Sequence, residues 1–300
     1  MALLQRLRGW FGGEIEAAAI PKFTFSSESL SCAGLEIKAA VVTDVGRART
    51  ENQDAVVFTR PGADSVLATH GVIAVIADGM GGCNGGMIAS TLACDSVPRH
   101  YFSSTERTPV ALRAAVEATN NQIYQTAQEH PELAGMGTTC IAVVVVGNRG
   151  WLAYVGDSRL YLIRAGHIYR MSEDHSVVFE MVRQGLLTPE EARNHEDRNV
   201  LSRALGTKPY VEVSCWEEPF PIRSDDRFLL CSDGLHDLVA DDELLKIAGN
   251  GEGGAAAEKL VETANKCGGH DNISVILLDA MDRAAPTRRP PAATREVQLP

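Results

Sequence analysis

The sequence predicts an α+β fold, in which paired strands and helices share one domain. Short runs of apolar, largely β-branched residues, such as 72–77, are followed by turn residues, which is typical of buried strands. Two further runs, 137–146 and 150–155, are joined by a short Asn-Arg turn, and this spacing predicts a hairpin. Residues 108–129 carry apolar side chains at helical spacing along one face. Together these observations predict hairpin-paired strands combined with amphipathic helices.

The same signals assign the remaining elements in chain order. Pro98 is expected to interrupt the first long helix, because proline lacks a backbone N–H. Asp241 and Asp242 are expected to cap the third helix, and Gly268 and Gly269 to end the fourth. The expected strands are 35–43, 55–59, 72–77, 137–146, 150–155, 160–164, 167–171, 210–216, 227–231 and 273–278. The expected helices are 87–101, 108–129, 241–247 and 255–266.

The chain divides into an N-terminal extension, one folded domain and a C-terminal tail. Residues 1–35 are expected to form a mobile extension, and residues 36–281 a domain large enough for a substantial core. Residues 282–300 are rich in Pro, Ala and Arg and are expected to be disordered, because they cannot bury enough apolar surface. The polar stretch at about 173–199 carries a Thr-Pro-Glu-Glu capping box and predicts a small helical insert.

Composition excludes several classes of protein. A formal net charge of −11 argues against a nucleic-acid-binding surface, which would be basic. The seven cysteines are scattered without a C-x-x-C pair, which argues against a disulfide framework or a zinc ribbon and suits a reducing compartment. No apolar run approaches the roughly 18 residues of a membrane span. We therefore expect a cytoplasmic monomer.

Four aspartates stand where apolar runs begin or end. Asp78, Asp157 and Asp233 each follow a predicted strand, whereas Asp271 precedes the last one. A single Asp-Gly pair more often marks a turn. If the last two strands are antiparallel neighbours, however, the end of one and the start of the other share an edge. All four carboxylates could then converge on one place.

The residue types at this edge favour a site for divalent cations. Carboxylates without His or Cys suit Mg²⁺ or Mn²⁺, and crowded carboxylates repel one another unless a cation neutralises them. Two such ions can activate a water molecule and hold the oxygens of a phosphoryl transfer. Asp78 is the natural bridging ligand, and Gly79 lets a backbone carbonyl approach an ion. Arg49 is the best candidate for binding a phosphate, because a guanidinium binds phosphate oxygens bidentately.

Six short motifs follow one another along the chain: RTENQD at 49–54, ADGMGG at 77–82, GTT at 137–139, GDSR at 156–159, CSDGL at 231–235 and HDN at 270–272. In this order they resemble the motifs of the metal-dependent protein phosphatases of type 2C, and the bacterial members are the most similar. The resemblance runs from about residue 38 to about residue 279. A single motif of this kind would carry little weight, but six in order are very unlikely to agree by chance.

The resemblance implies a central β-sandwich of two antiparallel sheets flanked by helices, in four αββα layers. The insert at 174–199 corresponds to a variable flap beside the active site. The implied activity is that of a serine/threonine protein phosphatase, which hydrolyses phosphoserine and phosphothreonine with a metal-activated water at a binuclear Mn²⁺ or Mg²⁺ centre. Its partners would be phosphorylated proteins, including a cognate serine/threonine kinase that it opposes.

The family's pattern also assigns the metal ligands. Asp78 bridges two metal ions, and Gly79 supplies a carbonyl oxygen. Asp233 and Asp271 complete the shell of one ion. Asp157, together with Asp233, resembles the third metal site of bacterial members. Alone, the turn that carries Asp157 could equally serve a structural hydrogen-bonding role.

The catalytic residues implied by the family are Arg49, which holds the substrate phosphate, and Asp54, which orients metal-bound water. Gln53 stands where many members carry Glu, and its amide brings no charge, so the second metal is expected to bind more weakly. Met80 stands where animal members often carry His, which leaves the general acid unassigned.

Other interpretations stay open at this point. The main alternative is a catalytically silent module of the same fold that binds a partner or phosphopeptide, and a small-molecule phosphatase on the same scaffold is a further one. His175 and His195 lie in the polar insert, and we expect them to be exposed to solvent rather than catalytic.

Overall fold

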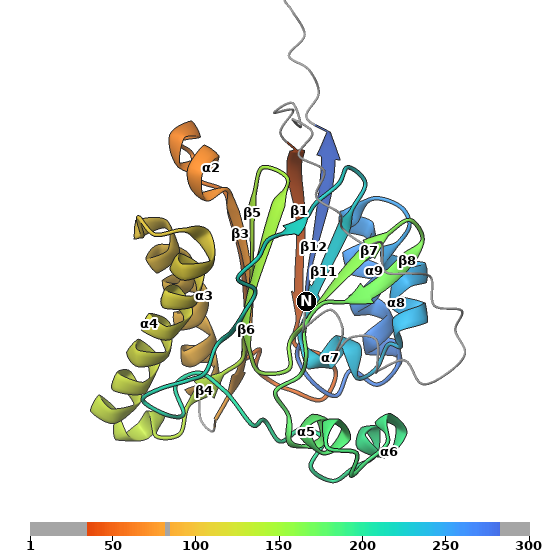
Figure 1. Ribbon diagram of the computed structural model, residues 1–300. Coiled ribbons are helices and arrows are strands. Elements are labelled where there is room, and N and C mark those ends of the chain that lie inside the picture. Colours follow the sequence, from red (N-terminus) through yellow and green to blue (C-terminus); the bar gives the residue numbers. More distant parts are fainter. Residues whose placement is uncertain (1–34, 82–84, 283–300) are drawn as a thin grey trace, which may run out of the picture. The chain divides into compact units, whose positions relative to one another are not determined.

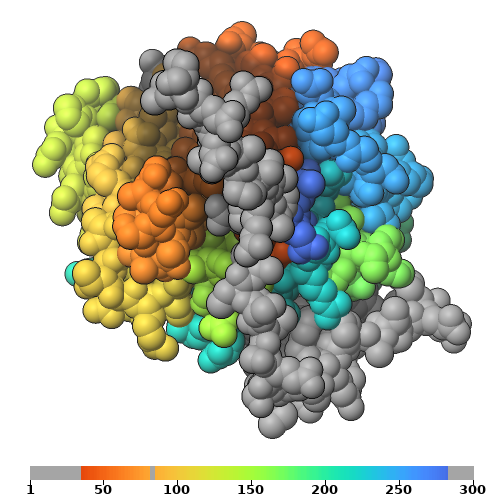
Figure 2. All heavy atoms as spheres, turned by 90° about the horizontal axis from the view of Figure 1, so that it is seen from above, coloured from red at the N-terminus to blue at the C-terminus, as the bar shows by residue number. Residues whose placement is uncertain are grey.

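A computed structural model describes residues 35–81 and 85–282, which all belong to one compact unit, residues 33–300. The expected N-terminal extension and C-terminal tail lie outside the described residues. Two antiparallel sheets pack face to face, and helices cover the outer face of each sheet (Figure 1). The α+β sandwich with four αββα layers is therefore confirmed. Viewed from above, the yellow residues gather on one side of the molecule and the blue residues on the other (Figure 2).

The first sheet contains the N-terminal and C-terminal strands of the domain side by side. Residue Ala39 of β1 lies opposite Leu278 of β12, and Leu229 of β11 lies opposite Leu277 of β12. In spatial order its strands are β1 (Leu35–Asp44), β12 (Ile273–Asp282), β11 (Arg227–Cys231), β7 (Arg159–Arg164) and β8 (His167–Arg170).

The second sheet is built around β3 and β5, which are buried along almost their whole length. In spatial order its main strands are β10 (Phe220–Pro221), β6 (Arg149–Val155), β5 (Cys140–Val146), β3 (Val72–Met80) and β2 (Asp54–Thr59). Two short strands extend it: β4 (Gly137–Thr138) pairs with β3, and β9 (Ser214–Cys215) pairs with β6.

The helices cover the outer faces of the sheets or stand at one end of the sandwich. On the side of the second sheet are α2 (Asp64–His70), α3 (Gly85–Ser103) and α4 (Thr108–Glu129), followed by the 3₁₀ helix η2 (Pro131–Leu133). On the side of the first sheet are α8 (Asp241–Ala248) and α9 (Gly253–Lys266). At the end where β4 lies in Figure 1 stand α5 (Val177–Arg183), α6 (Pro189–Arg193) and α7 (Asp233–His236).

Alternation along the strands explains the layers. In β3, Ala74 and Ile76 join the core between the two sheets, whereas Ile73 and Val75 pack in the core under α3 and α4. Successive side chains of a strand point to opposite faces, so a strand that is apolar throughout must be covered on both sides. The continuous apolar run that predicted a buried strand thus also accounts for the helical layer outside it.

Most expected elements are present, and the exceptions are local. The helix expected at 87–101 continues through Pro98, which is buried inside α3, so the expected interruption is wrong. Packing against α4 and β3 holds this helix together although the proline removes one backbone hydrogen bond. The strand expected at 210–216 is reduced to β9, and α8 begins at Asp241 without a side-chain cap. Helix α2 was not among the helices expected from the sequence.

The polar insert contains α5 and α6. As expected, Thr188 and Glu191 form a reciprocal capping box at the start of α6. The limits of the insert and of the domain stay predictions. Over the residues that the structure describes, no helix is long and apolar enough to cross a membrane.

Candidate functional site

The topology brings the ends of strands from both sheets to one place. Strands β11 and β12 are antiparallel neighbours, with Cys231 opposite Val275. Asp233, two residues after the end of β11, therefore lies at the same edge as Asp271, two residues before the start of β12. Asp78 lies near the end of β3, and Asp157 lies between β6 and β7, where the chain passes from one sheet to the other. The expected convergence of the four aspartates rests on this pairing.

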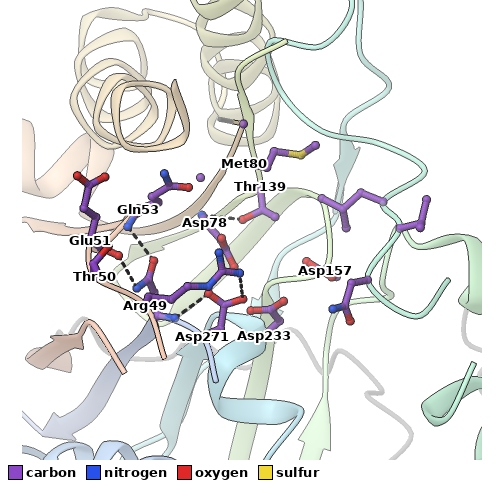
Figure 3. A pocket seen from close by; sticks show the side chains of 16 residues that line it. Arg49, Thr50, Glu51, Gln53, Asp78, Met80, Thr139, Asp157, Asp233 and Asp271 are labelled. Carbon is purple, nitrogen blue, oxygen red and sulfur yellow. Dashed lines mark hydrogen bonds and ion pairs between the residues drawn. The ribbon is translucent and has the colours of Figure 1, made fainter. Parts of the chain in front are cut away.

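One pocket is lined by all four of these aspartates and by Arg49 (Figure 3). Asp78, Asp233 and Asp271 point toward a common space, and the Asp157 carboxylate faces it from the side. Gly79 also lines the pocket, so six of the seven predicted site residues share it. The seventh, Asp54, lies behind the pocket wall.

Two hydroxyls connect Asp78 to the turn that carries Asp157. The Asp78 backbone N–H donates to Thr139 Oγ1 at 2.9 Å, and Thr139 Oγ1 lies 2.8 Å from Ser158 Oγ. Thr139 and Ser158 are both buried, so neither hydroxyl can exchange its partner for bulk water without cost. These hydrogen bonds fix the backbone of Asp78 in β3 relative to the turn between β6 and β7 that carries Asp157.

The buried hydroxyl of Ser232 holds the Asp54 carboxylate. Ser232 Oγ donates to Asp54 Oδ2 at 2.8 Å, and the Ser274 backbone N–H donates to Ser232 Oγ at 3.0 Å. Asp54 lies directly opposite Asp78 in the pairing of β2 with β3. It therefore supports Asp78 from the neighbouring strand, and it links that strand to β11 and β12 in the other sheet.

Arg49 forms an ion pair within the pocket. Its guanidinium donates to Asp271 Oδ2 at 2.8 Å, while just over half of its side-chain surface stays exposed. This hydrogen bond raises the pKa of Arg49, so the group is always charged. Asn272 organises the loop that carries Arg49, because its amide donates to the Val45 and Glu51 carbonyls. A cation thus stands at the mouth of an otherwise acidic pocket.

Gly79 is required by a close approach of three backbone segments. A Cβ at this position would lie 2.1 Å from the Gly86 carbonyl oxygen and 2.6 Å from that of Gln53. The Gly79 N–H donates to the same Gln53 carbonyl at 3.1 Å. The Gln53 side chain rests against the start of α3, since a Cβ on Gly86 would lie 2.6 Å from Gln53 Oε1. The amide that departs from the family's usual Glu is therefore tightly confined.

The electrostatics of the pocket are those of crowded carboxylates. Burial raises the pKa of Asp78 and of Asp157 well above the ordinary carboxyl value, and repulsion from Asp233 adds to both shifts. Burial likewise raises the pKa of Asp233 to about 6, although His236 opposes this shift, and raises that of Asp54 to about 6. A positive charge in addition to that of Arg49 would relieve the repulsion between these carboxylates.

The donor set fits a divalent cation in type and in charge. Over residues 35–81 and 85–282, no three Asp, Glu, His or Cys side chains form a ready-made metal-ligand cluster. However, Asp233 Oδ1 and Asp54 Oδ1 are buried without a hydrogen-bond partner among the described residues, which is costly for carboxylate oxygens. Oxygen ligands of this kind suit Mg²⁺ or Mn²⁺. The carboxylates therefore share a pocket but are not yet close enough to one another to form a complete ligand set. Their side chains have to move together when an ion binds.

The insert reaches the pocket through its returning end. Val200 and Leu201 line the pocket, and Leu201 forms a bridge with Ser176 at the start of the insert. His175, expected to be exposed, is buried with 5% of its surface accessible, and His195 is half-buried. The expectation for His175 was wrong because its burial depends on contacts with distant residues of β6 and β9.

Comparisons with known proteins agree with this architecture. The family model described as protein phosphatase 2C matches residues 46–251. The serine/threonine protein phosphatase PstP of Mycobacterium tuberculosis is 36% identical over 249 residues, covering 83% of this chain and 46% of PstP. The serine/threonine phosphatase stp of Listeria welshimeri is 35% identical over 243 residues, covering 79% of this chain and 93% of that relative.

A solved structure is similar over the same region. It is the catalytic domain of a serine/threonine protein phosphatase PstP in complex with two manganese ions, with a TM-score of 0.70 and 34% identity. The match covers 83% of this chain and 100% of that one. The chain thus spans less than half of the full mycobacterial relative, but it matches its catalytic domain throughout.

Proposed function

This chain belongs to the protein phosphatase 2C family, and we propose that it is a metal-dependent phosphatase acting on phosphoserine and phosphothreonine in proteins. The observation that carries the proposal is the convergence of four aspartates and Arg49 on one pocket. Relatives named as serine/threonine phosphatases support the substrate class. The structure bound to two manganese ions supports the use of a binuclear centre.

In this proposal the aspartates hold the cations. Asp78, Asp233 and Asp271, with the Gly79 carbonyl, would hold two ions. Asp157, together with Asp233, would hold a third ion more weakly. When bound, the cations lower the pKa of a water molecule and neutralise charge on the transferring phosphoryl group.

Arg49 binds the phosphate of the substrate. Its guanidinium contacts Asp271 at the mouth of the pocket, and its exposed half is free to meet an arriving phosphate. A guanidinium in this position fixes the phosphorus in line for attack by water while the bond to the Ser or Thr oxygen breaks. Asp54 keeps Asp78 oriented and, through it, the attacking water.

In this proposal the substrates are proteins phosphorylated on serine or threonine, including a cognate serine/threonine kinase and its targets. Val200 and Leu201 place the returning end of the insert at the pocket. This segment is therefore where the residues flanking the phosphorylated side chain would lie, and where substrate choice is made.

The proposal is tested with purified protein, p-nitrophenyl phosphate and a phosphothreonine peptide, each assayed with Mn²⁺, Mg²⁺ or EDTA. We expect metal-dependent turnover of both substrates. Turnover of the small ester but not of the peptide would replace the protein substrate by a small phosphate ester. A folded protein that turns over neither substrate with any ion would contradict the enzyme assignment and favour a silent binding module.

A further inference from the structure

His175 stands at the root of the insert and is buried, although the residues around it in the sequence are polar. Its backbone connects three segments. The His175 N–H donates to the Gly156 carbonyl at 2.9 Å, and the Ser202 N–H donates to the His175 carbonyl at 2.8 Å. One residue thus ties both ends of the insert to the turn that immediately precedes Asp157.

The side chain of His175 adds a second bond to the same turn. The Gly156 N–H donates to His175 Nδ1 at 3.1 Å, so Nδ1 must be the unprotonated nitrogen of a neutral ring. The hydrogen is then on Nε2, which lies 3.0 Å from Ser214 Oγ in β9 and donates to it. The ring also stacks on Tyr154 of β6, with centroids 5.0 Å apart. The tautomer and the orientation of the ring are both determined.

The turn at Gly156 depends on these bonds. Gly156 has a φ of +101°, and a Cβ there would lie 2.6 Å from the Thr139 side chain, so no other residue fits. Both polar backbone groups of this flexible residue are bonded to His175. The next residue is Asp157, whose carbonyl accepts from His236 Nε2 at 3.1 Å. The position of the Asp157 carboxylate is therefore set by what holds the Gly156 turn.

We propose that His175 is a positioning residue: its Nδ1 lone pair holds the Gly156–Asp157 turn, and so holds Asp157 at the pocket in register with the returning end of the insert. This inference rests on the proposed function, because it assigns Asp157 to a cation. It requires no contact between His175 and substrate. It predicts that the hydrogen-bond acceptor at Nδ1 matters more than the donor at Nε2.

Two substitutions separate these roles. In His175→Asn, the side-chain oxygen falls near the position of Nδ1 and can still accept from the Gly156 N–H. In His175→Gln, the terminal amide falls near Nε2 and can donate to Ser214, but nothing accepts from Gly156. Both variants lose the ring that stacks on Tyr154, so each is the control for the other. Ser214→Ala removes only the acceptor for Nε2.

The first readout is the affinity for Mn²⁺. It is measured in a titration from the electron paramagnetic resonance signal of the free ion, and it needs no turnover. We expect both His175→Gln and Asp157→Asn to weaken the weakest Mn²⁺ site on the order of 10-fold or more, since residues that orient ligands contribute about 10–100-fold to affinity. His175→Asn and Ser214→Ala should bind Mn²⁺ within about threefold of wild type. The second readout is kcat, which should fall in the Gln variant more than KM changes.

A purely structural role predicts something else. Both His175 variants would then melt at lower temperature by similar amounts and keep wild-type Mn²⁺ binding, which would overturn the proposal. If the Gln variant does not fold, His175→Ala takes its place, because it also removes the acceptor, while His175→Asn and Ser214→Ala control for the lost ring and the lost donor; wild-type Mn²⁺ binding in the Ala variant would overturn the proposal. If wild type has no turnover with any ion, the proposed function fails, while the Mn²⁺ titrations still decide the role of His175.

Discussion

Acidification should destabilise the fold through His175 in particular. Burial lowers the pKa of this imidazole to about 4, the charge of Arg203 adds to the lowering, and Asp174 opposes it. In the unfolded chain the same group has its ordinary pKa of about 6.5. Between these two values the unfolded chain takes up a proton that the folded protein excludes. The contribution of His175 to the free energy of unfolding is therefore complete above about pH 6.5 and is lost as the pH falls toward 4.

The size of the effect follows from the two pKa values. Each pKa unit corresponds to about 1.4 kcal/mol, and titration between pH 7.5 and 4.5 covers most of the difference, so about 2 to 3 kcal/mol is at stake. The free energy of unfolding is measured by urea denaturation in EDTA at both pH values, for wild type and for His175→Asn. The Asn variant cannot titrate at this position, but it retains every other acidic and basic group.

The comparison between the two proteins isolates the histidine. Carboxylates of the pocket titrate in both, so their contribution cancels in the difference. We expect wild type to lose about 2 to 3 kcal/mol more than the variant on going to pH 4.5. Equal losses in the two proteins would show that His175 is protonated as readily in the folded state as in the unfolded state, and would refute the reasoning.

Three further predictions concern two residues of the pocket and one buried ion pair elsewhere in the sandwich. Gly79→Ala should lower the free energy of unfolding by about 2 kcal/mol or more in urea denaturation, because its Cβ would overlap two carbonyl oxygens; wild-type stability would contradict the crowding. Arg49→Gln should lower kcat/KM for a phosphopeptide roughly 10- to 100-fold. The control is Arg47→Gln, which lies outside the pocket and should leave kcat/KM unchanged. Equal effects of the two substitutions would argue against phosphate binding by Arg49. Arg164 donates two hydrogen bonds of 2.6 Å to the buried carboxylate of Asp226. Asp226→Asn should lower the free energy of unfolding by about 3 kcal/mol in the same urea denaturation, because it leaves Arg164 without its counter-ion. A loss under about 1 kcal/mol would mean that Arg164 finds another partner.

The sequence predicted the geometry of the site best where a local pattern and a pairing rule act together. The apolar runs before Asp78 and Asp233 mark strands that end within two residues of these aspartates, and antiparallel pairing of the last two strands brings Asp271 to the same edge. Six residues with predicted roles therefore line one pocket. Their individual roles stay predictions until metal binding and turnover are measured.

Features that depend on distant contacts could not be read in this way. Helix α2 buries none of its residues completely, so it has no apolar stripe to reveal it, and its last residue is held by Tyr101, whose hydroxyl donates to the His70 carbonyl. Pro98 lies inside α3 because packing outweighs the lost hydrogen bond. His175 is buried by residues some 20 to 40 positions away in the chain, and no local signal in a polar segment indicates such partners.

The measurement that tests the account most directly is phosphatase turnover by Asp233→Asn in Mn²⁺, compared with wild type and with Asp242→Asn, an exposed aspartate of α8 outside the pocket. Asp233 joins the first sheet to the pocket, and one of its oxygens is buried without a partner. We expect turnover to fall on the order of 100-fold or more in Asp233→Asn, because a lost ligand removes charge stabilisation from the reacting phosphate, and to stay near wild type in Asp242→Asn. Turnover of folded Asp233→Asn at the wild-type rate, with the same dependence on Mn²⁺, would contradict the claim that the converging aspartates form the metal centre.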